Sequence, residues 1–212
     1  CNGIGGAISN FYSQMTINNC TFSGNSSGNM GGAIFYSQWV GSLTVTNSTF
    51  SGNTAVNSGG AIHNDYSEMT LHNTIMAGNT APAGPDGFNQ SGSFIAATYN
   101  LIGDNTGWNV PAGNGNILGT TATPVNPLLD ALANNGGATR TMALLCGSPA
   151  INAGNPAGTD ADQRGVAVSG GRKDIGAFES AFSTINTCPS NIVVSSAADA
   201  CGAIVNYVAP NG

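Results

Sequence analysis

The chain has 212 residues, and its composition restricts the partners that it can have. Only 7% of the residues are charged, and four basic against ten acidic side chains give a net charge of -6. Nucleic-acid binding needs a basic face, so this balance argues against it. The hydrophobic content of 41% allows one sizeable core, and no apolar run is long enough to cross a bilayer.

Residues 5–79 repeat one pattern three times. The motif Gly-Gly-Ala-Ile starts at residues 5, 31 and 59, so the copies are separated by 26 and then 28 residues. Each copy is followed by a Thr-aliphatic-x-Asn segment that ends in Gly-Asn, at 16–25, 44–53 and 70–79. A period of this length indicates stacked repeats. We expect rungs near 5–30, 31–58 and 59–86, and a degraded rung at 87–107.

Each repeat alternates apolar and polar residues, as a strand with one buried face does. Apolar residues share three columns: Met15, Leu43 and Met69; Ile17, Val45 and Leu71; and Phe22, Phe50 and Met76. Recurrent Asn and Gly mark turns, since both tolerate positive φ. The pattern predicts an all-β parallel β-helix, in which stacked Asn side chains form ladders. The predicted ladder residues are Asn19, Asn47, Asn73, Asn25, Asn53 and Asn79.

The paired motifs Gly-Gly-Ala-Ile and Phe-x-x-Asn, the latter at 22–25 and 50–53, resemble the repeats of polymorphic outer-membrane proteins and related right-handed β-helix surface proteins. This resemblance implies a right-handed helix and a cell-surface location.

Six ordered motifs between residues 100 and 179 resemble the C-terminal region of choice-of-anchor Q domain proteins. They include Asn-Leu-Ile-Gly at 100–103, Gly-Ser-Pro-Ala-Ile at 147–151 and Asp-Ile-Gly-Ala-Phe-Glu at 174–179. The resemblance implies that residues 108–179 form the last rungs and a cap that closes the open end of the stack. Independently, we expect residues 81–92 to form a loop that leaves the helix surface. Trp108 is expected to act as a lid over the core rather than as a surface aromatic.

Residues 180–187 are expected to be a linker. Residues 188–212 resemble the start of a hyalin repeat, an immunoglobulin-like β-sandwich of extracellular proteins. Cys188 and Cys201 flank a short strand-like run, and we expect them to form a disulfide. Cys20 is expected to be a buried thiol, although a bond to Cys1 is conceivable, and the pairing of Cys146 is left open.

Charged residues gather between 160 and 179. We expect a hydrogen-bond and ion-pair network that fixes irregular backbone there, with Arg164 on a carboxylate. The alternative is a calcium site that uses Asp160 and Asp162. No other cofactor is expected.

His63, Asp65, Glu68 and His72 are the only place where acids and both histidines gather. They would be the acid-base residues of a polysaccharide lyase or hydrolase. Such enzymes also use a basic group, and residues 1–139 contain no Lys or Arg. We therefore expect no catalysis.

The sequence favours a non-catalytic structural or adhesive segment of a large cell-surface or secreted protein. Its expected partners are copies of itself, as in a filament, other surface components or an extracellular polysaccharide. The predicted ligand contacts are Tyr12, Tyr36, Trp39 and Tyr66, in equivalent loops after the Gly-Gly-Ala-Ile motif. The alternatives are the carbohydrate-active enzyme and an ice- or carbohydrate-binding surface made by Thr16, Thr44 and Thr70.

Overall fold

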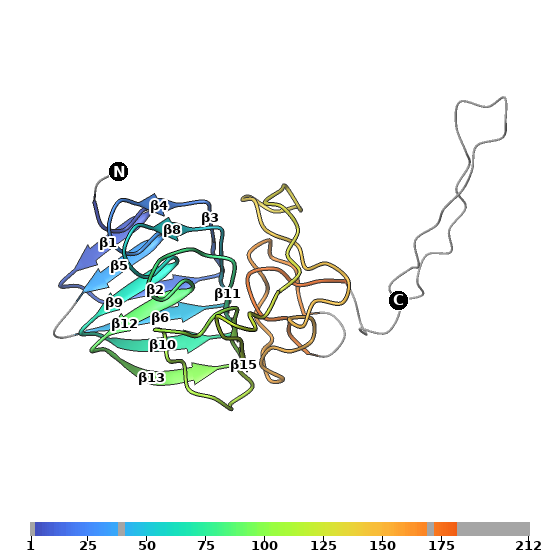
Figure 1. The fold of residues 1–212 in the computed structure, drawn as a ribbon. Coiled ribbons are helices and arrows are strands. Elements are labelled where there is room, and N and C mark those ends of the chain that lie inside the picture. Colours follow the sequence, from blue (N-terminus) through green and yellow to red (C-terminus); the bar gives the residue numbers. More distant parts are fainter. Residues whose placement is uncertain (1–2, 38–40, 169–171, 182–212) are drawn as a thin grey trace, which may run out of the picture.

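The structure is a computed structural model that describes residues 3–37, 41–168 and 172–181. These residues form an all-β protein in which every pair of named strands is parallel. Two of the sheets have four strands each, so the chain makes four turns of a β-solenoid. Figure 1 shows the stack running from β1 to β13.

The strands fall into four sheets, which we call A to D. Sheet A contains β1 (Ile8–Phe11), β5 (Ile34–Ser37), β9 (Ile62–Asp65) and β12 (Gly87–Gln90). Sheet B contains β2 (Met15–Asn18), β6 (Ser42–Thr46), β10 (Glu68–His72) and β13 (Ser93–Thr98). Sheet C contains β3 (Thr21–Ser23), β7 (Thr49–Ser51), β11 (Ile75–Met76), β14 (Leu101–Ile102) and β15 (Ile117–Leu118). Sheet D contains β4 (Ser26–Ser27) and β8 (Thr54–Ala55).

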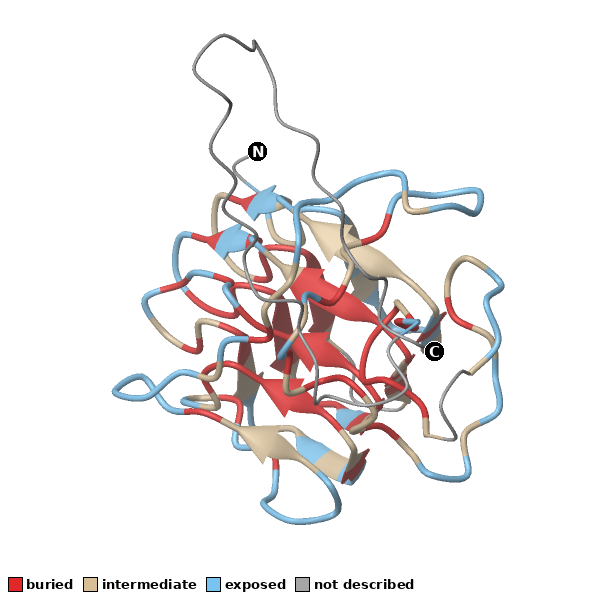
Figure 2. Ribbon diagram, turned by 90° about the vertical axis from the view of Figure 1, so that its right-hand side faces the viewer, coloured by how far each residue is buried: buried red, intermediate tan, exposed pale blue. Residues whose placement is uncertain are grey.

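The register confirms the predicted columns. Leu43 lies between Met15 and Met69, and Phe50 pairs with both Phe22 and Met76. The rings of Phe22 and Phe50 stack with centroids 4.6 Å apart. The inward columns form the core between the sheets, and Figure 2 shows the buried residues concentrated on the strands, with most exposed residues in loops.

The Gly-Gly-Ala-Ile motif recurs because neither glycine has room for a side chain. The first glycine has positive φ, for example +68° at Gly31. The second glycine lies against the next rung along the chain: a Cβ on Gly32 would be 1.9 Å from the carbonyl oxygen of Gly60. The motif is thus the corner at which consecutive turns approach most closely.

The fourth turn begins within the loop that we predicted. We expected residues 81–92 to leave the solenoid, but β12 pairs with β9 and places Gly87 opposite Ile62. A Cβ on Gly87 would lie 2.4 Å from the indole of Trp108. Trp108 therefore fills the space that isoleucine fills in the other rungs.

Trp108 is fully buried and contacts Phe94 edge-on, with ring centroids 5.4 Å apart. This confirms its predicted position as a lid over the core. Trp108 and Val110 belong to the main core cluster, so residue 108 lies within the solenoid.

One of the two predicted Asn ladders is continuous. Asn25 Nδ2 donates to Asn53 Oδ1, and Asn53 Nδ2 donates to Asn79 Oδ1, each at 2.8 Å. Asn79 Nδ2 then donates to Asp86 Oδ1 at 2.9 Å. Asp86 ends the ladder because a carboxylate only accepts, and its second oxygen accepts the N–H of Asp104.

The second ladder is interrupted. Asn73 donates to Asn47, but Asn47 donates to Asn18 instead of Asn19. Asn19, Asn47 and Asn73 all have the predicted positive φ, between 47° and 52°. Asn19 Nδ2 bonds to the carbonyl oxygen of Ala161, far along the chain.

Residues 120–168 and 172–181, which we call the flanking segment, lie beside the solenoid (Figure 1). They contact the first rung at Asn19, through Ala161, and the third rung at Asn73, whose Nδ2 donates to Asp174 O at 2.9 Å. A second apolar cluster joins them to sheet C: Ile75, Ala77, Leu101, Leu144, Ala150, Ile151 and Ile175. These described contacts lie on a flank of the solenoid, and the cap over the end of the stack stays a prediction.

The hyalin-like segment at 188–212 lies outside the described residues, as do Cys188 and Cys201 and most of the expected linker. Cys20 is a free thiol, half-buried, and donates to Asn18 O at 3.1 Å. A Cys1 to Cys20 bond is therefore wrong. In the part of the chain that the structure describes, no helix has the length and hydropathy to cross a membrane.

Candidate functional site

The four predicted acid-base residues do not share a face. His63 and Asp65 lie on β9 of sheet A, whereas Glu68 and His72 lie on β10 of sheet B. Both histidines alternate with core residues and project outward from different sheets. The arrangement that a lyase or hydrolase would need from these four residues is absent.

His63 is enclosed by aromatic rings. Phe35 and Phe88 occupy the neighbouring rungs, and each ring centroid lies 5.3 Å from that of His63. Nδ1 is hydrogen-bonded to the Ser58 hydroxyl at 2.9 Å, and the residue is 1% exposed. Burial lowers the pKa of His63 to about 4, so the ring is neutral near pH 7. Because its ring is buried and neutral, His63 contributes to packing between the rungs.

Asp65 and Glu68 flank the corner between these sheets. Ser37 Oγ donates to Asp65 Oδ2 at 3.3 Å, and burial raises the pKa of Asp65. Glu68 is exposed at the start of β10. Neither lines the polar cavity that His72 lines, described below.

The predicted tyrosine contacts divide into two kinds. Tyr36 is fully buried in the core, and its hydroxyl donates to Ser13 O at 3.1 Å, so it cannot meet a ligand at the surface. Tyr12 and Tyr66 are 80% and 45% exposed. Trp39 lies outside the described residues.

Tyr12 and Tyr66 occupy equivalent corners between sheets A and B. Their φ angles are +59° and +57°, which a bulky residue adopts only when its surroundings enforce it. Phe11, which sequence reasoning did not select, is 47% exposed beside Tyr12, with ring centroids 6.2 Å apart. We call these three exposed residues at equivalent corners, Phe11, Tyr12 and Tyr66, the aromatic corner.

Asp162 is the centre of a network in the flanking segment. It forms an ion pair with Arg164 at 2.7 Å and is 5% exposed. Its two oxygens also accept the backbone N–H groups of Arg164, Val166 and Glu179, at 2.8 to 2.9 Å. Donors from the protein thus occupy the carboxylate of Asp162, one of the two ligands of the calcium site that the sequence suggested as an alternative. Among the described residues, no three His, Cys, Asp or Glu side chains are grouped as a metal site would need.

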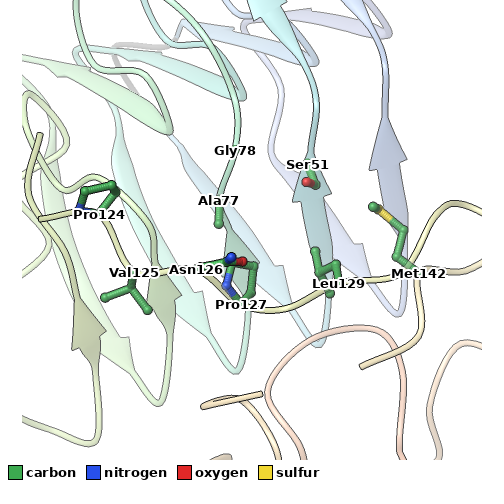
Figure 3. Close-up of a pocket in the computed structure, with 9 residues that line it drawn as sticks. All are labelled: Ser51, Ala77, Gly78, Pro124, Val125, Asn126, Pro127, Leu129 and Met142. Carbon is green, nitrogen blue, oxygen red and sulfur yellow. The ribbon is translucent and has the colours of Figure 1, made fainter. Parts of the chain in front are cut away.

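An apolar cavity of about 310 Å³ lies where the flanking segment meets sheet C (Figure 3). Pro127 and Leu129 line one side, and Ala77 and Ser51 come from the solenoid. No charged side chain lines it. It offers no group that could do acid-base chemistry.

A polar cavity of about 140 Å³ lies between sheet B and the flanking segment. His72 lines it from the solenoid, and burial lowers the pKa of this ring. Its Nδ1 is hydrogen-bonded to the Thr98 hydroxyl, and its Nε2 lies 3.5 Å from Asn155 Nδ2. The full lining is Asn18, Thr46, Asn47, His72, Asn155, Gly158, Asp160 and Lys173.

Sequence reasoning missed this cavity because its two halves are about one hundred residues apart. The missing basic group, absent from residues 1–139, is supplied here by Lys173. In the sequence, the one local indication of the cavity was that His72 aligns with Asn18 and Thr46 in a polar column of the repeats.

Two segments of the chain, residues 19–37 and 47–65, match the Chlamydia polymorphic membrane protein repeat. The matches cover less than one fifth of the chain and span β3 to β5 and β7 to β9. No curated protein and no solved structure matches the chain. The solenoid is thus built from repeats similar to those of polymorphic membrane proteins.

Proposed function

We propose that this chain is a non-catalytic adhesive segment of a larger cell-surface or secreted protein. The observation that carries this proposal is the repeat match, which falls on two successive turns of the parallel solenoid. A solenoid presents extended, repetitive faces on a rigid stack. Such faces suit binding to a surface or polymer better than catalytic turnover of a substrate. The burial of His63 in its aromatic stack also speaks against acid-base catalysis.

The aromatic corner of Phe11, Tyr12 and Tyr66 is the adhesive contact that we propose. Tyr12 and Tyr66 are two rungs apart, a rise of about 9.6 Å at the usual strand spacing. This separation is close to the length of a disaccharide unit in an extended glycan. Exposed aromatic faces are suited to stacking on sugar rings, and the positive φ at both tyrosines is a backbone cost of the kind found at functional sites.

The test is binding of the purified chain to insoluble cellulose and chitin, followed by pull-down. The Tyr12→Ala/Tyr66→Ala variant is expected to lose at least tenfold in bound fraction. Val56→Ala removes an apolar side chain that is 58% exposed elsewhere and is the matched control.

Equal retention by the tyrosine variant and the Val56 control would refute the aromatic contact. Release of soluble oligosaccharides would refute the non-catalytic assignment and make the carbohydrate-active enzyme the better account.

A further inference from the structure

Lys173 is a buried cation that has no ion-pair partner among the described residues. The residue is 2% exposed, and its Nζ donates to the carbonyl oxygen of Asp160 at 2.7 Å. The ion pair between the described residues is that of Arg164 with Asp162, so no described carboxylate oxygen lies within 4.0 Å of Lys173 Nζ. An ammonium has three donors, so two remain for another acceptor.

A buried charge is costly unless it is paired and hydrogen-bonded. Burial is the main cause of the lowered pKa of Lys173, and it outweighs the opposing fields of Asp160, Glu179 and Asp162. The neighbouring acids therefore do not compensate the charge fully. The polar cavity that Lys173 lines is the place where an anion would do so.

The rest of the cavity wall is polar and mostly neutral. Asn155 comes from the flanking segment, and the ring of His72, whose pKa burial lowers, comes from the end of β10. Asn18 is the last residue of β2, and Asn47 follows β6. Amide N–H groups add donors for an oxyanion without adding charge.

Asp160 also lines the cavity and limits how much negative charge it accepts. A singly charged group balances Lys173, whereas a dianion would be repelled by this carboxylate. Gly158 leaves room for the lysine stem, because a Cβ there would lie 3.2 Å from Lys173 Cδ.

The outer face of sheet B leads to the cavity. Thr16, Thr44 and Thr70 form an in-register column of hydroxyls on the same face as His72, and Thr16 is exposed. Hydroxyl groups on an extended parallel sheet can hydrogen-bond to a polymer that lies across the strands. The cavity at the end of these strands would then receive one charged substituent.

We propose that the polar cavity binds a carboxylate or sulfate-ester group of an acidic polysaccharide, with the Lys173 ammonium as its counter-ion. This site is separate from the aromatic corner, and it stands whether or not the adhesive role proposed above is correct.

The test is isothermal titration calorimetry of the full chain with polygalacturonate at low ionic strength. Fully methyl-esterified polygalacturonate is the uncharged polymer, and acetate and methyl sulfate are the free anions. Lys173→Met removes the charge while keeping the apolar stem. Arg140→Gln removes an equal charge from an exposed position and is the matched control.

We expect polygalacturonate to bind at least tenfold more weakly to Lys173→Met than to the Arg140→Gln control. The methyl ester is expected to bind equally weakly to both. A second variant, Asn155→Ala, should weaken binding by a smaller factor and checks the site independently if Lys173→Met does not fold.

Equal binding of polygalacturonate by Lys173→Met and Arg140→Gln would overturn the proposal. Acetate or methyl sulfate binding as tightly as the polymer would support the oxyanion site but overturn the polysaccharide as its source. Unsaturated products absorbing in the ultraviolet would leave the site intact and contradict only the non-catalytic role.

Discussion

The rungs and the flanking segment are stabilised in different ways. In the rungs, strands pair with their copies one turn away, and columns of similar side chains repeat the same contact. The flanking segment has no named strand, and its pairing consists of two isolated antiparallel bridges, Leu129 with Leu144 and Ala133 with Thr141. All four basic residues of the chain lie in this segment.

The difference shows that two kinds of stability coexist in one chain. The stability of a rung depends mainly on its neighbouring rungs. A substitution should therefore destabilise the solenoid most where consecutive turns approach most closely. The flanking segment depends on a few side chains that each satisfy several backbone groups, such as Asp162. Single substitutions should therefore separate the two regions.

The largest expected effect comes from Gly32→Ala. Its φ is not positive, so the cost is steric: the Cβ would lie 1.9 Å from Gly60 O and 2.7 Å from backbone atoms of Thr54. Two turns would have to move apart. We expect a loss of about 5 kcal/mol or more in the free energy of unfolding, or failure to fold. Urea denaturation followed by circular dichroism measures it.

Gly3→Ala is the control, because nothing lies within 4 Å of that Cβ. If Gly32→Ala were as stable as Gly3→Ala, the close approach of the turns would be wrong, and the rungs would not be stabilised differently from the flanking segment in this respect.

Removing the Trp108 side chain is expected to lower the free energy of unfolding slightly less than Gly32→Ala does. Trp108→Ala leaves a cavity below Gly87 at the end of the core, and we expect a loss of about 4 kcal/mol. Adding Gly87→Ile to that variant restores the side chain found in the other rungs and should recover about half. Thermal denaturation of the two variants and of Gly87→Ile alone measures the coupling.

Gly87→Ile alone is expected to be destabilising, because it clashes with the indole. Additive effects of the two changes would show that Trp108 does not fill the isoleucine position.

The sequence was sufficient for the rungs because their period is visible in it. It predicted the register of Met15, Leu43 and Met69 and the ladder from Asn25 to Asn79. It failed at Gly87, where glycine looked like a turn residue and is explained only by Trp108, about twenty residues later.

The candidate site was less predictable. The four residues chosen from rung three were neighbours in sequence but were separated by the corner at Tyr66. Conversely, Lys173 meets His72 only because the flanking segment runs beside the stack. No periodicity relates an irregular segment to the rung on which it lies.

Asp162→Ala tests the flanking segment directly. Removing the carboxylate leaves Arg164 and three backbone N–H groups without their acceptor, and we expect this region to lose about 3 kcal/mol. Hydrogen exchange followed by mass spectrometry should show faster exchange in residues 150–168 and unchanged exchange in β5 to β10. Asp130→Ala, at an exposed position of the same segment, is the control.

Faster exchange throughout the rungs of Asp162→Ala would contradict the separation of the two regions. It would mean that the flanking segment is required for the solenoid.

The smallest expected effect is the response of the rungs to acid. The pKa of His63 is about 4 in the folded chain, below the ordinary 6.5, so the unfolded chain binds more protons between these values. Stability from this residue is full above pH 6.5 and falls as the pH is lowered towards 4, by up to about 3 kcal/mol. His63→Phe completes the aromatic column of Phe35 and Phe88 and removes this dependence.

Asp86 complicates the measurement, because burial raises its pKa to about 6 and its protonation favours the folded chain as the pH falls. The difference between wild type and His63→Phe cancels this contribution. Urea midpoints at pH 7 and pH 4.5 should show that the wild type loses more stability than the variant over this interval. If both lose the same amount, the histidine is not held neutral in the stack, and the acid sensitivity of the chain lies in the flanking segment instead.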